Sequence, residues 1–257
     1  MKRLIALLVT VLTLFSVSIA AAERLDDKTL MSFYDNCLMI GDSRMENFHY
    51  YVSSARQNDD QFFKNTTIVG SHSMSLHMGS RNIITTSPFF YRARRNTMYG
   101  IADQINAKRV IILLGLNDTI ASKPDKAVEW VKDIFRFMKE TESKPEVYFL
   151  SETPVTANYG IRKNHPEYQE ELDAYNVLLK ELCESNGAHY IEISEPLKGE
   201  DNLLKDEYSS DRICHLNDKG YAIMVQCMFD YAQEQYDLGL WKPAAEQFSS
   251  PEQAHDQ

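Results

Sequence analysis

The sequence predicts an α/β fold in which a parallel sheet lies between two layers of helices. Five short runs are apolar on both faces, as expected for strands buried on both sides of a parallel sheet. Helical patterns separate these runs, and a repeated strand–helix alternation is typical of parallel strands in one sheet. The predicted strands are residues 36–41, 66–70, 109–115, 146–151 and 188–193.

Three helices follow from apolar periodicity and from signals at their ends. Residues 125–140 repeat apolar positions at the spacing of one helix face. Residues 165–187 have Pro166 near the start and Gly187 just past the end, as helix boundaries predict. Residues 216–236 form the last predicted helix.

Residues 71–100 have no clear strand or helix period. A long irregular segment in a compact domain is usually functional. We therefore expect it to lie over the carboxyl ends of the strands, where ligands bind in open α/β sheets.

The first 22 residues have the pattern of a secretory signal peptide. Lys2 and Arg3 precede an uncharged apolar stretch that ends in three alanines. A membrane anchor is the alternative, but the apolar core is short for a span of about 20 residues and no basic flank follows it. We therefore expect residues 1–22 to be removed, residues 23–240 to form one secreted or extracytoplasmic domain, and residues 241–257 to be a flexible tail.

The chain carries 37 acidic and 27 basic side chains, a formal net charge of −10. Such a surface repels the phosphates of nucleic acids and anionic membranes. We therefore expect no nucleic-acid partner and no stable membrane insertion after signal cleavage, and a monomer is the default.

Four cysteines are present, without the C-x-x-C spacing of zinc and redox motifs. Buried free thiols and disulfides both remain open, because an exported protein can oxidise its cysteines. The four are Cys37, Cys183, Cys214 and Cys227.

Ser43 follows the first predicted strand within the sequence Gly41-Asp42-Ser43. A serine between a strand and a helix exposes its hydroxyl beside the free N–H groups of the helix, which favour developing negative charge. Asp42 or Ser43 could equally be an ordinary helix cap.

Asn117 follows the third predicted strand, in Gly115-Leu116-Asn117-Asp118. A neighbouring parallel strand brings its loop to the same edge as Ser43, where an amide N–H can stabilise an oxyanion. The alternative role of Asn117 is an Asx turn leaving the strand.

His215 precedes the last predicted helix, at the same edge. A histidine there can take the serine proton and return it to a leaving group. Asp211 can orient the imidazole.

These segments, "GDS" (41–43), "GLND" (115–118) and "D…HLN" (211–217), resemble the SGNH hydrolases, also called GDSL-type esterases. The resemblance extends from about residue 36 to 235. Each motif alone is weak, and the set is specific. The resemblance implies a flavodoxin-like three-layer α/β/α sandwich with a five-stranded parallel sheet, and a serine ester hydrolase without metal or cofactor.

Carried over by position, the resemblance gives each residue a role. Ser43 becomes the nucleophile and a backbone oxyanion donor, and Asn117 becomes an oxyanion donor through its side chain. His215 becomes the general base and then the general acid, and Asp211 becomes its orienter.

The sequence departs from the family pattern at two places. The acidic residue usually lies three residues before the histidine, where this chain has Arg212, and Asp211 lies four residues before. If the extra residue of this loop bulges out, Asp211 can still present its carboxylate to His215. Otherwise a backbone carbonyl orients His215, and Ser43 and His215 act as a dyad. The glycine that completes the oxyanion hole is also missing, so Ser73, ranked first, or Gly70 supplies that N–H group.

Two further residues are candidates for substrate binding. Arg44 follows the nucleophile and could meet an acidic group of a substrate, although an ion pair with a surface aspartate is the more ordinary role. His72 flanks the predicted oxyanion loop and either lines the pocket or is solvated.

Together these features predict a secreted ester hydrolase that removes short acyl groups, such as acetyl, from a carbohydrate or another small ester. The absence of an obvious apolar lid favours short acyl groups, and the expected partner is a small-molecule or glycan ester. A non-catalytic or acyl-transferring protein of the same fold that binds glycan is the alternative. The altered spacing before His215 and the missing oxyanion glycine favour a non-catalytic protein, whereas the intact Ser43, Asn117 and His215 weigh against it.

Overall fold

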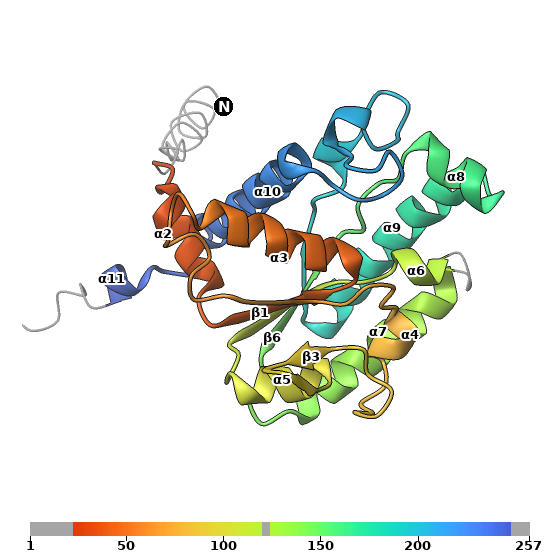
Figure 1. Cartoon of the computed structure of the whole chain (residues 1–257). Helices are drawn as coiled ribbons and strands as arrows, with labels where there is room; N and C mark the ends of the chain where they lie inside the picture. The colour runs from red at the N-terminus through yellow and green to blue at the C-terminus, as the bar shows by residue number, and fades with distance from the viewer. Residues whose placement is uncertain (1–22, 120–123, 248–257) are drawn as a thin grey trace, which may run out of the picture.

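The computed structural model describes residues 23–119 and 124–247 (Figure 1). Five parallel strands form one sheet in the order β2-β1-β5-β6-β7, and helices cover both of its faces. The predicted α/β/α fold with a five-stranded parallel sheet is therefore confirmed. The strands are β1 (Cys37–Gly41), β2 (Thr67–Gly70), β5 (Arg109–Leu113), β6 (Glu146–Leu150) and β7 (His189–Ile191).

The two faces of the sheet build two separate cores, because successive side chains of a strand point to opposite sides. In β1, Cys37 and Met39 pack into the first core, whereas Leu38 and Ile40 pack into the second. Every residue of β1 is buried, since this strand lies between β2 and β5 and under helices on both faces.

The first core lies beneath α2, α3 and α10. Helices α3 and α10 lie side by side on this face of the sheet (Figure 1). The chain enters α10 through Asn217, whose side chain accepts hydrogen bonds from the amides of Lys219 and Gly220. These elements are α2 (Asp27–Met31), the 3-10 helix η1 (Ser32–Tyr34), α3 (Ser43–Ala55) and α10 (Asp218–Asp237).

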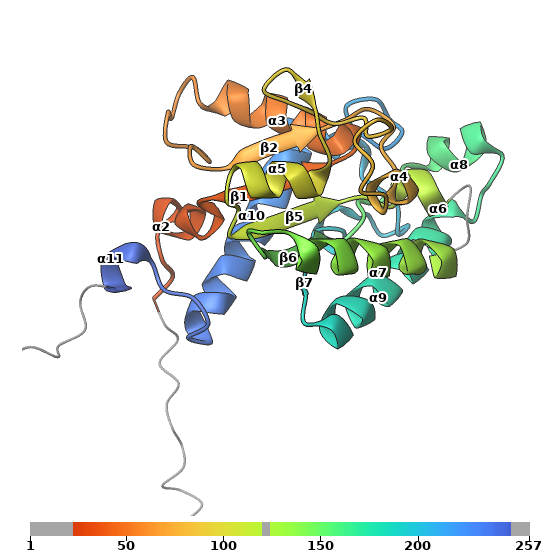
Figure 2. The ribbon, with the colours of Figure 1, turned by 90° about the horizontal axis from the view of Figure 1, so that it is seen from below.

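The second core lies beneath α5, α7 and α9 on the opposite face (Figure 2). Gly187 ends α9 with a φ of 69°, the left-handed conformation that a glycine adopts without strain. The three helices are α5 (Met98–Gln104), α7 (Pro124–Glu140) and α9 (Tyr168–Asn186).

Short elements connect these layers. Among the helices, α5 and α8 were not predicted from the sequence. The 3-10 helices are η2 (Glu195–Leu197) and η3 (Asp206–Tyr208). The other short elements are α4 (Leu76–Gly79), β3 (Phe90–Tyr91), β4 (Arg94–Arg95), α6 (Leu116–Thr119), α8 (Ala157–Lys163) and α11 (Ala244–Gln247).

The segment 71–100 is divided between two roles. Its first part reaches the carboxyl edge of the sheet, where the Asn117 side chain donates to the carbonyl of Met74. Its second part forms the antiparallel β3–β4 hairpin and buries Phe89 and Met98 in the second core. The expectation that the whole segment covers the strand ends is therefore wrong for the second part, because its apolar side chains are needed by the core.

The predicted signal peptide and most of the predicted tail, residues 248–257, lie outside the described residues. The expected start of the tail is wrong, because Trp241 packs edge-on against Phe33 at 5.3 Å between ring centroids. Within the described part of the chain, no helix is long and apolar enough to cross a membrane. All four cysteines are free thiols.

Parallel strands place the segments that follow β1, β2, β5 and β6 at one edge of the sheet. The candidate residues from the sequence, apart from Gly70 in β2, fall on these segments and on the one that leads into α10.

Candidate active site

Ser43 is the first residue of α3, directly after the turn that leaves β1. Asp42 caps the helix by accepting a hydrogen bond from the Arg44 amide. Gly41, just before the cap, lies so close to β5 that a Cβ atom would come within 2.5 Å of the Leu113 carbonyl oxygen, so a residue without a side chain is needed here. The amide of Ser43 lies in the first helical turn, so it has no intrahelical acceptor.

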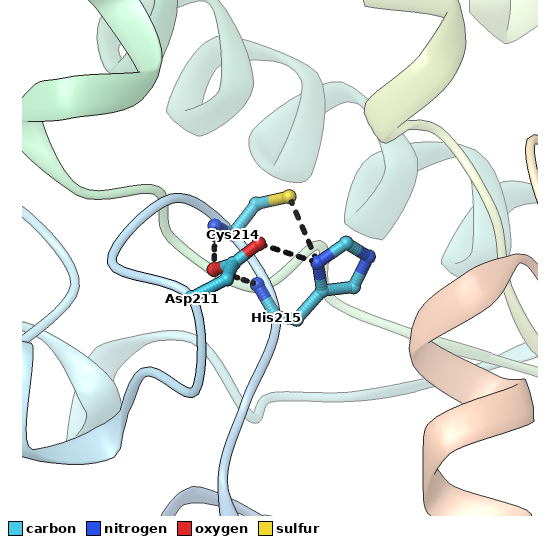
Figure 3. A group of neighbouring side chains, drawn as sticks. All are labelled: Asp211, Cys214 and His215. Carbon is cyan, nitrogen blue, oxygen red and sulfur yellow. Dashed lines mark hydrogen bonds and ion pairs between the residues drawn. The ribbon is translucent and has the colours of Figure 1, made fainter.

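Ser43 and His215 meet although they are 172 residues apart in the sequence. The Ser43 Oγ atom lies 2.9 Å from His215 Nε2, and His215 Nδ1 lies 2.7 Å from Asp211 Oδ2. Figure 3 shows the Asp211 carboxylate beside the imidazole. The carboxylate accepts a hydrogen bond from Nδ1–H, so the proton stays on Nδ1 and the Nε2 lone pair faces the serine hydroxyl.

The four-residue spacing between Asp211 and His215 is accommodated by a tight local turn. Arg212 takes a left-handed conformation with a φ of 56°. Asp211 Oδ1 then accepts hydrogen bonds from the amides of Ile213, Cys214 and His215, at 2.8, 3.1 and 3.2 Å. The extra residue bulges, and the second carboxylate oxygen still reaches the imidazole.

The hydrogen bonds to Asp211 also determine its charge. Partial burial raises the pKa of Asp211, but the bonds from the His215 ring and from the Ile213 and His215 amides outweigh burial. The pKa of this carboxyl therefore lies below its ordinary value, which favours the ionised form.

Asn117 and Asp118 hold the loop that follows β2. The Asn117 Nδ2 atom donates to the Met74 carbonyl oxygen at 2.8 Å, and a second amide proton remains for another acceptor. The buried Asp118 carboxylate accepts hydrogen bonds from the amides of Leu76 and His77. Burial raises the pKa of Asp118 to about 6, although these backbone hydrogen bonds oppose the shift.

Of the two candidates for the missing oxyanion glycine, only Ser73 lies in this loop. Ser73 is exposed, has a left-handed φ of 58°, and directly precedes the residue that accepts from Asn117. In the described part of the chain its N–H group has no acceptor.

Gly70 instead belongs to β2, where it pairs with Gly41. A Cβ atom at Gly70 would lie 2.0 Å from the Glu46 backbone nitrogen of α3. The glycine is therefore needed for the close packing of α3 on the sheet, and its proposed place in the oxyanion loop is wrong.

The expectation that Arg44 contacts substrate or lies on the surface is also wrong. Its side chain is completely buried and forms ion pairs at 2.6 Å with both Asp42 and Glu152. Its Nη1 atom also donates to Thr153 Oγ1 at 3.1 Å. A guanidinium held in this way beneath the nucleophile cannot reach a substrate without breaking the network.

Glu152 is the residue of this network that the sequence analysis missed. It follows β6, and Asn176 of α9 bonds to both its backbone amide and its carbonyl. Burial raises the pKa of Glu152 to about 7, opposed by the nearby Arg44 and reinforced by Asp42. An acidic residue directly after an apolar strand, at the edge that carries the other candidates, was the available signal.

His72 is exposed on the oxyanion loop, and no hydrogen-bond partner for its ring lies in residues 23–119 or 124–247. Among residues 23–119 and 124–247, one group could hold a metal ion: Asp211, Cys214 and His215, with ligand atoms within 4.8 Å of one another (Figure 3). However, burial raises the pKa of the Cys214 thiol to about 12. The Asp211 carboxylate already accepts five hydrogen bonds, from three backbone amides, the Ser209 hydroxyl and the His215 ring. Asp211 and His215 therefore fit a serine–histidine–aspartate triad better than a metal site.

A profile of the GDSL-like Lipase/Acylhydrolase family matches residues 40–223, which include Ser43, Asn117, Asp211 and His215. The chain belongs to this family. A comparison with curated proteins found no match for this acylhydrolase-family chain.

Several solved structures share the fold. A candidate platelet activating factor from Streptococcus pneumonia is 20% identical with a TM-score of 0.59, covering 88% of this chain and 99% of its own. A GDSL-like lipase from Bacteroides thetaiotaomicron VPI-5482 is 15% identical with a TM-score of 0.57, and the match covers 84% of this chain and 93% of the lipase chain. An acetyl xylan esterase is 12% identical with a TM-score of 0.52, and the match covers 76% of this chain and 98% of the esterase chain. At these identities the likeness shows the fold alone.

We expect Asn117→Ala to lower kcat for p-nitrophenyl acetate by about 10²–10³-fold, the usual effect of removing one oxyanion donor. KM should change little, because the donor acts on charge that develops in the transition state. Steady-state kinetics with Asn58→Ala, an exposed asparagine near the end of α3, as the control would measure this. An unchanged kcat would remove Asn117 from the reaction.

We expect Asp211→Asn to lower kcat by roughly 10³–10⁴-fold, because an amide no longer stabilises the Nδ1–H tautomer or the imidazolium. Asp206→Asn, which changes a nearby acidic residue in η3, should retain activity. Equal activity of the two variants would mean that Ser43 and His215 work as a dyad.

We expect Arg44→Met to lower the free energy of unfolding at pH 7 by about 3–5 kcal/mol, because it leaves two buried carboxylates unpaired. Glu152 has a folded-state pKa of about 7, above its unfolded value of 4.5, so its contribution to stability is greatest below pH 4.5 and is lost as pH rises through 7. Without Arg44 that pKa rises further, so the difference from wild type should shrink between pH 7 and pH 5. Urea unfolding at both pH values would test this, with the exposed Arg136→Met as the control. A loss as small as in the control, about 1 kcal/mol or less, would contradict it.

Proposed function

We propose that the chain is a serine ester hydrolase that removes short acyl groups, such as acetyl, from a carbohydrate or another small ester. One observation supports this most directly: a serine hydroxyl, an imidazole and a carboxylate form a continuous hydrogen-bonded series at the carboxyl edge of the sheet. Membership of the GDSL-like Lipase/Acylhydrolase family supports the same reaction class.

In the first half of the proposed reaction, His215 Nε2 takes the proton of Ser43 as Oγ attacks the ester carbonyl carbon. The imidazolium is stabilised by the ionised Asp211 at 2.7 Å. The tetrahedral oxyanion accepts hydrogen bonds from the free amide proton of Asn117 and from the backbone N–H groups of Ser43 and Ser73.

The alcohol then leaves after His215 returns the proton to its oxygen. In the second half, His215 takes a proton from water, and the resulting hydroxide attacks the acyl group on Ser43. The carboxylic acid leaves and Ser43 recovers its proton, so the protein is unchanged after one turnover.

Two observations favour short acyl groups on a polar alcohol. The sequence shows no apolar lid for a long chain, and one protein that shares the fold is described as an acetyl xylan esterase. Residues 1–22 have a signal-peptide pattern, so we also propose that the enzyme is exported and acts outside the cytoplasm. The proposed oligomeric state is the default, a monomer.

A serine-reactive fluorophosphonate probe tests the proposed function. We expect wild type to be labelled and Ser43→Ala to remain unlabelled, because only an activated hydroxyl attacks the phosphorus atom. Turnover of p-nitrophenyl acetate should exceed that of p-nitrophenyl palmitate. A folded wild type that neither reacts with the probe nor hydrolyses either ester would be a binding protein instead.

A further inference from the structure

A groove with a volume of about 650 Å³ lies between α3 and the start of α10. This volume is within the range of ordinary ligand sites. One wall comes from α3 and the other from the segment that carries His215 into α10. Residues that matter for its chemistry are Asn47, Tyr50, Ser54, Ser210, Asn217 and Lys219.

The α3 wall continues the helix face that carries the nucleophile. Asn47, Tyr50 and Ser54 are four, seven and eleven residues after Ser43, the spacing of side chains along one side of a helix. At about 1.5 Å per residue, Ser54 lies roughly 16 Å from Ser43 along the helix axis. The groove therefore leads away from the Ser43 end of α3.

The opposite wall belongs to the segment that positions the general acid. The amide of Ser210 donates to the carbonyl oxygen of His215 at 2.9 Å, and Asn217 caps α10 two residues after His215. The proton on Nε2 must reach the leaving alcohol, so the alcohol part of an ester lies on the His215 side of Ser43. The oxyanion donors come from Asn117 and the loop after β2, so the groove lies on the alcohol side of the reacting carbon.

The lining of the groove suits a sugar better than an alkyl chain. The Tyr50 ring is 61% exposed and offers a flat apolar face. The side chains of Asn47, Tyr50 and Ser54 have no hydrogen-bond partner in the described part of the protein, so their amide and hydroxyl groups are available to a ligand. A sugar ring presents hydroxyl groups at its rim and C–H groups on its faces, and it can use both kinds of surface at once.

We propose that this groove binds the sugar chain that bears the scissile acyl group, with the sugar on the leaving-alcohol side of Ser43. The proposal rests on the ester hydrolase function proposed above and adds the substrate class: an O-acetylated oligosaccharide rather than an isolated small ester. Ser43 and His215 do not line the groove themselves, but its lining includes Leu216 and Asn217, the two residues after His215. In this proposal the acetylated ring lies beside Ser43 and His215, and the rest of the sugar chain extends into the groove.

The test compares two substrates in wild type, Tyr50→Ala and Asn47→Ala. One is a partially O-acetylated xylo-oligosaccharide, followed by acetate release, and the other is p-nitrophenyl acetate, which is too short to occupy the groove. We expect KM for the oligosaccharide to rise about tenfold in Tyr50→Ala, as for the loss of one aromatic contact. We expect kcat/KM for p-nitrophenyl acetate to be unchanged in both variants, because neither residue belongs to the reacting set.

Ile161→Ala is the matched control, since this side chain is 76% exposed and lines a different, more apolar groove beside α8. Binding of the deacetylated oligosaccharide to Ser43→Ala, measured by calorimetry, gives a second readout that does not depend on turnover. That binding should weaken about tenfold when Tyr50→Ala is added to Ser43→Ala.

Each outcome has a definite meaning. If wild type hydrolyses both substrates and the groove variants leave the oligosaccharide KM and binding unchanged, the groove proposal is wrong and the hydrolase function stands. A rise in KM for Ile161→Ala alone would place the sugar in the other groove and overturn the proposal. If wild type hydrolyses p-nitrophenyl acetate but not the oligosaccharide, the substrate class is wrong, and if it hydrolyses neither ester, the proposed function itself fails.

Discussion

The buried guanidinium of Arg44 is the interaction on which the carboxyl edge of this protein depends. It connects Asp42, at the end of β1, with Glu152 and Thr153, at the end of β6. Its own backbone carbonyl accepts a hydrogen bond from the Tyr221 hydroxyl of α10, at 2.7 Å. A single residue therefore fixes two strands and two helices relative to one another.

This arrangement has an energetic reason. An isolated buried cation costs several kcal/mol, and its ion pairs offset that cost only when their geometry is good. Arg44 has a carboxylate on two sides and a hydroxyl on a third, so any displacement of the strand ends leaves a charge unpaired. Ser43 directly precedes Arg44 in the sequence. The network around Arg44 therefore keeps the Ser43 hydroxyl in one position at the start of α3.

The rest of the site is held by local hydrogen bonds rather than by buried charge. Asp211 gathers three backbone amides of its own turn and presents its second oxygen to His215. The Asp118 carboxylate similarly accepts hydrogen bonds from two amides of the loop after β2. The side chain of the neighbouring Asn117 donates to the Met74 carbonyl in the same loop. Each departure from the usual family pattern is thus accommodated by a carboxylate that fixes an irregular backbone.

The sequence by itself determined the sheet, its principal helices and the segments that carry the reactive side chains. Short runs that are apolar on both faces and bounded by turn residues indicate buried strands, and Gly187 marks the end of α9 through a local conformational preference. Side chains that follow neighbouring parallel strands meet at one edge, so the neighbourhood of Ser43 and Asn117 was predictable without coordinates. His215 lies just before α10 rather than after a strand, and its place at this edge was predicted from its position before the last helix and from the family motif.

Only the tertiary structure decided what depends on long-range contacts. The burial of Arg44 needs Glu152, which lies 108 residues away, and no local pattern records that partner. The role of Gly70 depends on the approach of Glu46 in a neighbouring helix, and the bulge at Arg212 depends on where His215 must point. Local sequence encodes backbone preference and periodicity, whereas the partner of a buried charge and the space around a glycine are properties of the assembled fold.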